Sequence, residues 1–129
     1  MEVSAQKRIL VVDDEEVVRS LCTRLLTPLG YSVETAPDGP QALKCFEKQA
    51  FDLVLTDYRM PGGMNGLELG QSIKQKFSQA QIILMTAFPA VDTAVEMLRM
   101  GATDYLIKPF NPSELLKCVK SCFAKPRPG

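Results

Sequence analysis

Short apolar runs alternate with helical patterns along the whole chain. Five of these runs predict β-strands, at residues 9–12, 31–36, 51–56, 82–86 and 104–107. The first, third and fourth are almost entirely Val, Ile and Leu, which is typical of strands covered on both faces, whereas residues 31–36 alternate like an edge strand. Helical periodicity follows each strand. The pattern therefore predicts an α/β fold, doubly wound, with five strand–helix units around a parallel sheet.

Start and stop signals mark the predicted helices. The first helix is expected to end at Pro28-Leu29-Gly30, and the fifth to begin with Asn111 as its cap, Pro112 in its first turn and Glu114 placed to bond back to the cap. The apolar stripe of the first helix comprises Val18, Leu21, Cys22, Leu25, Leu26 and Leu29. The middle helices begin near Asp38-Gly39-Pro40, Asn65-Gly66 and Phe88-Pro89.

Length and charge narrow the possible functions. The 129 residues suit one domain, which we place at residues 1–124, with 125–129 as a tail or the start of a linker. Lys plus Arg and Asp plus Glu both number 15, so a neutral chain offers no basic field for nucleic acid or an anionic membrane. The apolar run at residues 9–12 is too short for a signal peptide or membrane span. We expect a cytoplasmic domain that does not itself bind nucleic acid.

The chain contains no histidine, and this excludes the usual general base and the commonest metal ligand. The four cysteines form no C-x-x-C pair, so we expect no zinc site. Cys22 and Cys122 occupy apolar helix positions and are predicted to be buried in a protein of a reducing compartment.

Polar side chains follow four of the five predicted strands. Asp13 and Asp14 follow the first, Asp57 follows the third, Thr86 ends the fourth and Lys108 follows the fifth. In an open parallel sheet, ligands bind outside the carboxyl ends of the strands. We therefore expect these five side chains to share one site.

Three carboxylates at one site repel one another. At about 4 Å each pair costs roughly 4 kcal/mol at an effective dielectric constant near 20, so the site requires a cation or raised pKa values. An all-oxygen ligand set completed by water and a phosphate favours Mg²⁺ over Ca²⁺. Lys108 adds a positive charge and Thr86 a hydroxyl donor, and the set predicts a pocket for a phosphoryl group.

Each residue also has a simpler interpretation. Asp13 or Asp14 alone could cap the next helix, and Asp57 alone could begin a turn. Thr86 could simply end a strand, and Lys108 could be an exposed charge. The joint pattern at four strand ends favours the shared site.

Four motifs resemble the receiver domains of two-component response regulators. They are Asp13-Asp14 after an apolar strand, the segment from Asp57 to Pro61 (DYRMP), Met85-Thr86-Ala87, and residues 101–110, which contain Tyr105 and Lys108. The resemblance covers residues 7–124. It implies a flavodoxin-like (βα)5 fold with strand order 2-1-3-4-5.

The resemblance also implies a role for each site residue. Asp57 is the expected phosphoacceptor, which takes a phosphoryl group from a phosphohistidine of a sensor histidine kinase or a phosphotransfer protein. Asp14 is the expected direct Mg²⁺ ligand, Asp13 acts largely through water, and the backbone carbonyl of Arg59 occupies a further ligand position beside Asp57. Lys108 is expected to pair with the phosphoryl oxygens.

A conformational switch is also implied. Thr86 and Ala87 are expected to bind the phosphoryl group, and Thr86 turns inward so that Tyr105 rotates into the vacated space. This changes the face made by the fourth helix, the fifth strand and the fifth helix. That face is expected to control a C-terminal output domain or another partner, and the resemblance allows a homodimer through it. The domain is expected to act on no external substrate, so it is not an enzyme in the usual sense.

Some positions near the site are unusual. Gly66 follows the motif proline by five residues where the family has four, so the loop has one extra residue, and Gly62 and Gly63 can accept its dihedral angles. Arg59 and Phe88 flank the expected path of attacking water and could lengthen or shorten the phosphoryl lifetime. Four apolar residues could form a partner surface, and core packing explains some of them equally well: Phe88, Val91, Met97 and Met100.

The sequence argues against three other functions. A nucleotide or flavin binder requires a Gly, Ser or Thr-rich loop after the first strand, where this chain has four acidic residues. An aspartyl-phosphate phosphatase requires two Asp residues two positions apart, and this chain has Asp13 and Glu15 there. A receiver that serves only as an interaction module would have lost the acceptor, metal or lysine positions, all of which are present.

Overall fold

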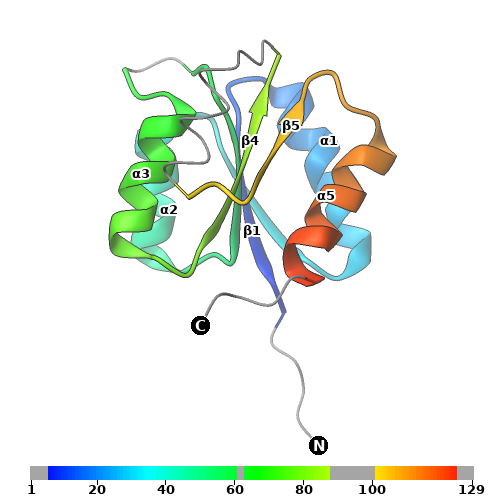
Figure 1. Ribbon diagram of the computed structural model, residues 1–129, viewed down its shortest axis with the longest axis horizontal. Coiled ribbons are helices and arrows are strands. Elements are labelled where there is room, and N and C mark those ends of the chain that lie inside the picture. Colours follow the sequence, from blue (N-terminus) through cyan, green and yellow to red (C-terminus); the bar gives the residue numbers. More distant parts are fainter. Residues whose placement is uncertain (1–5, 61–62, 88–100, 125–129) are drawn as a thin grey trace, which may run out of the picture.

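A central parallel sheet organises the computed structural model, which describes residues 6–60, 63–87 and 101–124 (Figure 1). The strand order β2-β1-β3-β4-β5 confirms the predicted flavodoxin-like topology and the edge position of β2. The predicted strand ends differ from the observed ones by no more than two residues. The strands are β1 Arg8–Val12, β2 Ser32–Ala36, β3 Leu53–Asp57, β4 Gln81–Thr86 and β5 Asp104–Ile107.

Helices cover both faces of the sheet. In Figure 1, α1 and α5 lie on one side of it and α2 and α3 on the other. Their bounds are α1 Glu16–Leu26, α2 Gly39–Lys48, α3 Gly66–Lys76 and α5 Pro112–Ala124. The helix predicted to start near Phe88-Pro89 lies outside the described residues, as do Pro61, Gly62 and the apolar positions 91, 97 and 100.

Alternation along β1 divides the core into two parts. Leu10 and Val12 point toward α2 and α3, where they join Phe46 and Ile73. Ile9 and Val11 point to the other face and join the side chains of α1 and α5, including Cys22, Leu26, Leu115, Val119 and Cys122. The predicted burial of Cys22 and Cys122 is confirmed. Because successive strand residues face opposite sides, a nearly continuous apolar strand is what two helical layers require.

The first helix is shorter than predicted. It ends at Leu26, and residues Thr27–Leu29 form a separate 3₁₀ turn with Pro28 near its start. Proline has no N–H for an α-helical hydrogen bond, so the chain tightens there, and Gly30 closes the turn at φ 95°. Leu29 is consequently exposed, and its predicted place in the buried stripe is wrong.

Two of the helices, α3 and α5, begin with a reciprocal capping pair. The Glu68 N–H donates to the Asn65 side chain while the Glu68 carboxylate accepts from the Asn65 N–H, at the start of α3. The pair Asn111 and Glu114 makes the same two bonds before α5, as predicted. Each cap satisfies two N–H groups that the helix itself leaves without partners.

Replacing Asn111 with alanine is expected to lower the free energy of unfolding by about 1 kcal/mol, because the Glu114 N–H loses its acceptor. Urea denaturation followed by circular dichroism measures the change. Ser113→Ala, an exposed position in the same turn, is the control. Equal stability of the two variants would contradict the capping role.

None of the helices that the structure describes combines the length and the apolar character that a membrane crossing demands.

Candidate functional site

The sheet brings the acidic residues together at its carboxyl edge. Val12 pairs with Thr56 across β1 and β3, so the next residues, Asp13 and Asp57, lie side by side. The Asp13 N–H donates to the Ala36 carbonyl at 3.1 Å, which extends the pairing with β2 beyond the strand. The strand order reverses between β1 and β3, and ligands bind at such a point in doubly wound folds.

Three carboxylates form a tight cluster here. Oxygen atoms of Asp13, Asp14 and Asp57 all lie within 4.8 Å of one another. Asp13 is fully buried and Asp57 is 8% exposed, whereas Asp14 faces solvent. The capping interpretation of Asp13 and Asp14 is wrong, because the N-cap of α1 is Glu15. Asp13 instead accepts a hydrogen bond from the Glu15 N–H at 2.9 Å, and this turns the chain out of the strand.

Lys108 reaches the cluster from the end of β5. Its Nζ atom lies 2.6 Å from Asp13 Oδ2 and 3.4 Å from Asp57 Oδ2. The Glu15 Oε1 atom, from a more exposed side chain, lies 3.4 Å from the same ammonium. A backbone bond from the Lys108 N–H to the Thr86 carbonyl, at 2.8 Å, holds the start of this loop against β4. Lys108 is therefore a cation shared among carboxylates, and the exposed-charge interpretation is wrong.

Burial and mutual repulsion shift the protonation of the cluster. Burial, with the neighbouring charge of Asp13, raises the pKa of Asp57 to about 6, although Lys108 partly opposes the rise. Burial also raises the pKa of Asp13, against the hydrogen bond from Lys108. For Lys108, burial alone would lower the pKa, but the bond to Asp13 and the charges of Asp13 and Asp57 raise it. The folded protein thus holds more negative charge here than Lys108 alone offsets.

This donor set fits a hard divalent cation. Carboxylate oxygens within 4.8 Å of one another can contact a single ion, and the exposed Asp14 leaves one side open to water or to a phosphate. Sulfur and imidazole ligands are absent from the described cluster, which suits Mg²⁺ better than a transition metal.

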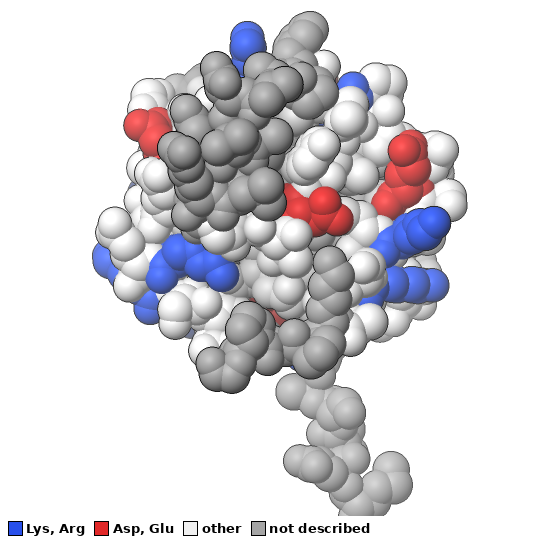
Figure 2. Space-filling model, viewed as in Figure 1, with Lys and Arg blue, Asp and Glu red and all other residues white. Residues whose placement is uncertain are grey.

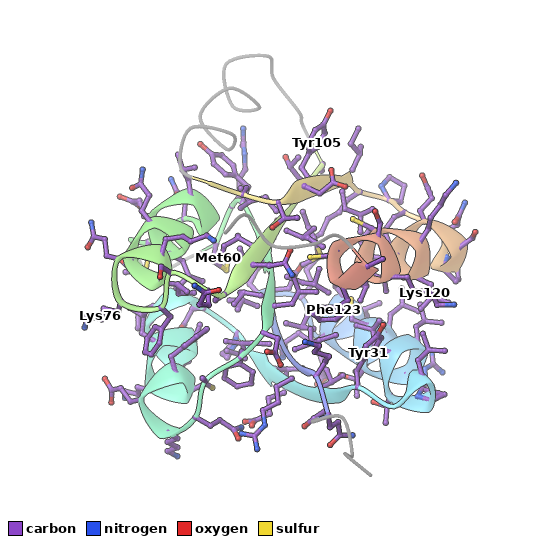
Figure 3. The ribbon with its side chains drawn as sticks, turned by 60° about the horizontal axis from the view of Figure 1, so that its bottom comes forward. Tyr31, Met60, Lys76, Tyr105, Lys120 and Phe123 are labelled. Atoms are coloured by element: carbon purple, nitrogen blue, oxygen red, sulfur yellow. The ribbon has the colours of Figure 1, made fainter. Side chains whose placement is uncertain are left out.

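The remaining predicted site residues are Thr86, Ala87, Arg59 and Tyr105, and they differ in burial and in their place relative to the acidic cluster. Thr86 is buried at the end of β4, one residue beyond the Asp57–Met85 pair, and Ala87 follows it at the surface. Arg59 is exposed, in the loop after β3. Tyr105, in β5, lies opposite Leu84 of β4. Its side chain is 42% exposed and points away from the sheet (Figure 3). The structure therefore does not bring Tyr105 to the acidic cluster.

The start of α3 lies against the end of β3. The Gly66 N–H donates to the Tyr58 carbonyl at 2.7 Å, and the Gly66 Cα faces the backbone carbonyl of Asp57. Gly63 adopts φ 80°, a conformation that glycine reaches without strain. The start of α3 is therefore held close to the backbone of Asp57.

Two residues near the site were not predicted. Glu15 shares Lys108, and its place in an acidic run was the available signal. Arg19 donates from its Nη1 to the Asp13 carbonyl at 2.7 Å. Its position one turn into α1 carries no comparable signal in the sequence.

The geometry defines a flavodoxin-like α/β domain with an acidic, lysine-containing site at the carboxyl edge of its sheet. The family model of the response regulator receiver domain matches residues 9–120. The chain belongs to this family and is a receiver domain of the two-component response regulators. The family match therefore favours a receiver domain over a nucleotide-binding domain or a phosphatase.

Curated relatives are longer than this chain. A probable transcriptional regulator, ycf27, of Cyanidium caldarium is 42% identical over 116 residues, which are 90% of this chain and 46% of the relative. The alginate biosynthesis transcriptional regulatory protein AlgB of Pseudomonas aeruginosa is 40% identical over 117 residues, 89% of this chain and 26% of the relative. The chain thus spans less than half the length of these proteins.

Solved structures match nearly end to end. The chemotaxis protein CheY4 of Vibrio cholerae has a TM-score of 0.86 and 34% identity, over 92% of this chain and 99% of that one. The response regulator TrrA of Thermotoga maritima, in complex with Mg²⁺-BeF, has a TM-score of 0.80 and 41% identity, over 91% of this chain and 99% of that one.

Proposed function

We propose that Asp57 is the phosphoacceptor of a two-component switch and takes its phosphoryl group from a sensor histidine kinase or a phosphotransfer protein. The observation that carries the proposal is the position of its carboxylate. It lies at the switch point of the sheet, within 4.8 Å of two further carboxylates and 3.4 Å from the Lys108 ammonium. Membership of the receiver family supports the same role.

The transfer forms one bond and breaks another. An Asp57 carboxylate oxygen attacks the phosphorus of the donor phosphohistidine, the phosphorus–nitrogen bond breaks, and the imidazole leaves with a proton from solvent. With a pKa of about 6, Asp57 is mostly ionised at pH 7 and available as the nucleophile. Lys108 is placed to pair with the phosphoryl oxygens that arrive beside Asp57.

We propose that Mg²⁺ is held by Asp13, Asp14, Asp57 and the backbone carbonyl of Arg59. The bound ion would supply positive charge to the phosphoryl oxygens. The close carboxylate oxygens support this assignment, as does the Mg²⁺-BeF complex of the similar protein TrrA.

We propose that Thr86, Ala87 and Tyr105 carry the signal away from Asp57. Thr86 and Ala87 lie at the end of β4 beside the acceptor strand, and they would bind the phosphoryl oxygens. Tyr105 is 42% exposed, and we propose that it rotates inward from this position as Thr86 moves. The affected face comprises β5, α5 and the predicted helix outside the described residues.

The proposed partners are the phosphodonor protein and an output domain after residue 124, because the curated relatives are longer and are named transcriptional regulators. A homodimer through the face containing β5 and α5 is a further proposed arrangement. Figure 2 shows one face of the molecule, on which the described Lys and Arg side chains lie in small separate groups with Asp and Glu between them. Because acidic and basic residues are equal in number, we propose that this domain does not itself bind nucleic acid. We place the protein in the cytoplasm and propose that its only catalysis is its own phosphorylation and dephosphorylation.

Intact mass after incubation with acetyl phosphate tests the proposal. With Mg²⁺ the parent is expected to gain a single phosphoryl group, and removal of Mg²⁺ with EDTA or the substitution Asp57→Asn is expected to abolish the gain. A folded, Mg²⁺-supplied parent that remains unmodified by both acetyl phosphate and phosphoramidate would instead be an interaction module.

A further inference from the structure

The peptide unit between Asp13 and Asp14 sets how the two carboxylates face a common ion. β1 ends at Val12, so this peptide lies beyond the strand. On one side of it, the Asp13 N–H donates to the Ala36 carbonyl. The carbonyl of the peptide itself, which belongs to Asp13, accepts from Arg19 Nη1 at 2.7 Å. Because the peptide is planar, rotation of this carbonyl would also turn the N–H of Asp14, and it would change the backbone angle on which the rotamer of the Asp14 side chain depends.

Arg19 reaches this carbonyl because of its place in α1. It lies one turn into the helix, and its N–H donates to the Glu15 carbonyl at 3.2 Å. Helical side chains lean toward the N-terminus of their helix, so a long side chain at this position extends back over the first turn toward the end of β1. Asp13 is fully buried, so water does not readily replace a lost donor.

The contact acts on the backbone and not on the carboxylate. Arg19 Nη1 contacts the Asp13 carbonyl oxygen, whereas Lys108 Nζ contacts the Asp13 carboxylate, at 2.6 Å from Oδ2. Lys108 and Arg19 therefore contact different groups of Asp13 and act on them differently. Lys108 offsets the charge of the carboxylates, whereas Arg19 orients the peptide that joins two of them.

We propose that Arg19 is a positioning residue for the Mg²⁺ site, acting through the Asp13 carbonyl. This inference rests on the proposed function, because it presumes that Asp13 and Asp14 serve one bound ion. Residues that orient metal ligands typically change metal affinity by about 10–100-fold when replaced. The arginine has no contact of its own with the ion in this proposal.

Calorimetric titration with Mg²⁺ tests the assignment without any phosphodonor. Arg19→Met, which keeps the apolar stem, is expected to weaken Mg²⁺ binding about tenfold. The Mg²⁺ concentration for half-maximal phosphorylation by acetyl phosphate should rise by the same factor, while the rate at saturating Mg²⁺ stays near that of the parent. Arg19→Lys, which retains one donor, should recover part of the affinity. The matched control is Arg24→Met, which removes an exposed arginine from the last turn of the same helix.

The outcomes separate the two proposals. Parental Mg²⁺ affinity in a folded Arg19→Met variant would overturn the role of Arg19 and leave the proposed function intact. An equal loss of affinity in Arg24→Met would also overturn it, because the effect would then be one of general charge. If Arg19→Met does not fold, Arg19→Lys decides, since an affinity equal to that of the parent would show that the guanidinium is not required. A parent that binds no Mg²⁺ would overturn the proposed function and this inference together.

Discussion

Replacing Asp57 with asparagine is expected to stabilise the metal-free protein at neutral pH. The folded state holds the pKa of Asp57 near 6, compared with an ordinary value of 3.8, because the carboxylate is buried beside Asp13. Below pH 3.8 the group is protonated in both states and imposes no penalty. As the pH rises through 3.8 the unfolded chain releases its proton first, so the folded state loses relative stability until the pH passes about 6.

The expected gain is about 3 kcal/mol at most, at roughly 1.4 kcal/mol for each pH unit between the two pKa values. Asparagine resembles the protonated acid in shape and removes the penalty. Urea denaturation at pH 7.5 and pH 4.5 in EDTA measures the gain, which should be large at the higher pH and much smaller at the lower. Glu47→Gln, which removes an exposed negative charge on α2, is the control and should show little change.

Added Mg²⁺ provides a second comparison. An ion that binds only the folded state stabilises it by about 2.7 kcal/mol at 100 times its dissociation constant. The parent should respond more than Asp57→Asn, because the variant lacks one carboxylate of the proposed site. A variant less stable than the parent in EDTA at pH 7.5 would contradict the electrostatic penalty at Asp57.

The outline of the fold could be predicted because burial leaves a periodic record in the sequence. Strands covered on both faces are continuously apolar, as in residues 9–12, and the edge strand β2 alternates. The strand order came from the family resemblance and not from periodicity. Periodicity places the end of α1 too late, because the apolar stripe continues to Leu29 although Pro28 has already tightened the chain into a 3₁₀ turn.

The site could be predicted only in part. Side chains that directly follow strands are brought together by the parallel topology, so Asp13, Asp57 and Lys108 were accessible from position alone. Arg19 acts through a side chain that folds back over a helical turn, and the sequence does not record which carbonyl it reaches. The raised pKa of Asp57 likewise depends on how deeply the finished fold buries its carboxylate.

The contact between α3 and the acceptor strand was also not predicted. Counting from the motif proline places Gly66 one residue late and suggests a disturbed loop. In the structure the Gly66 backbone approaches the Asp57 carbonyl so closely that a side chain does not fit between them. A close approach of two backbones is a tertiary requirement that spacing alone does not show.

Gly66→Ala is therefore expected to be severe. A Cβ atom at this position would overlap the Asp57 carbonyl oxygen and would lie 3.0 Å from both its carbonyl carbon and Leu84 Cδ2. Backbone atoms cannot rotate out of the way as a flexible side chain can, so either α3 or the end of β3 must move. Overpacking of this kind typically costs about 1–3 kcal/mol of stability. If the Asp57 carboxylate shifts by about 1 Å, phosphoryl uptake should slow on the order of 100-fold.

Gly63→Ala separates this effect from the loss of any glycine in the same loop. Gly63 has φ 80° and open space around it, so alanine there incurs backbone strain of about 1 kcal/mol without touching Asp57. Stability should fall in both variants, but the rate of phosphorylation by acetyl phosphate should fall strongly only in Gly66→Ala. A parental rate in Gly66→Ala would show that the start of α3 can withdraw without moving the acceptor. An equal loss in Gly63→Ala would show that the whole loop, and not this one contact, positions Asp57.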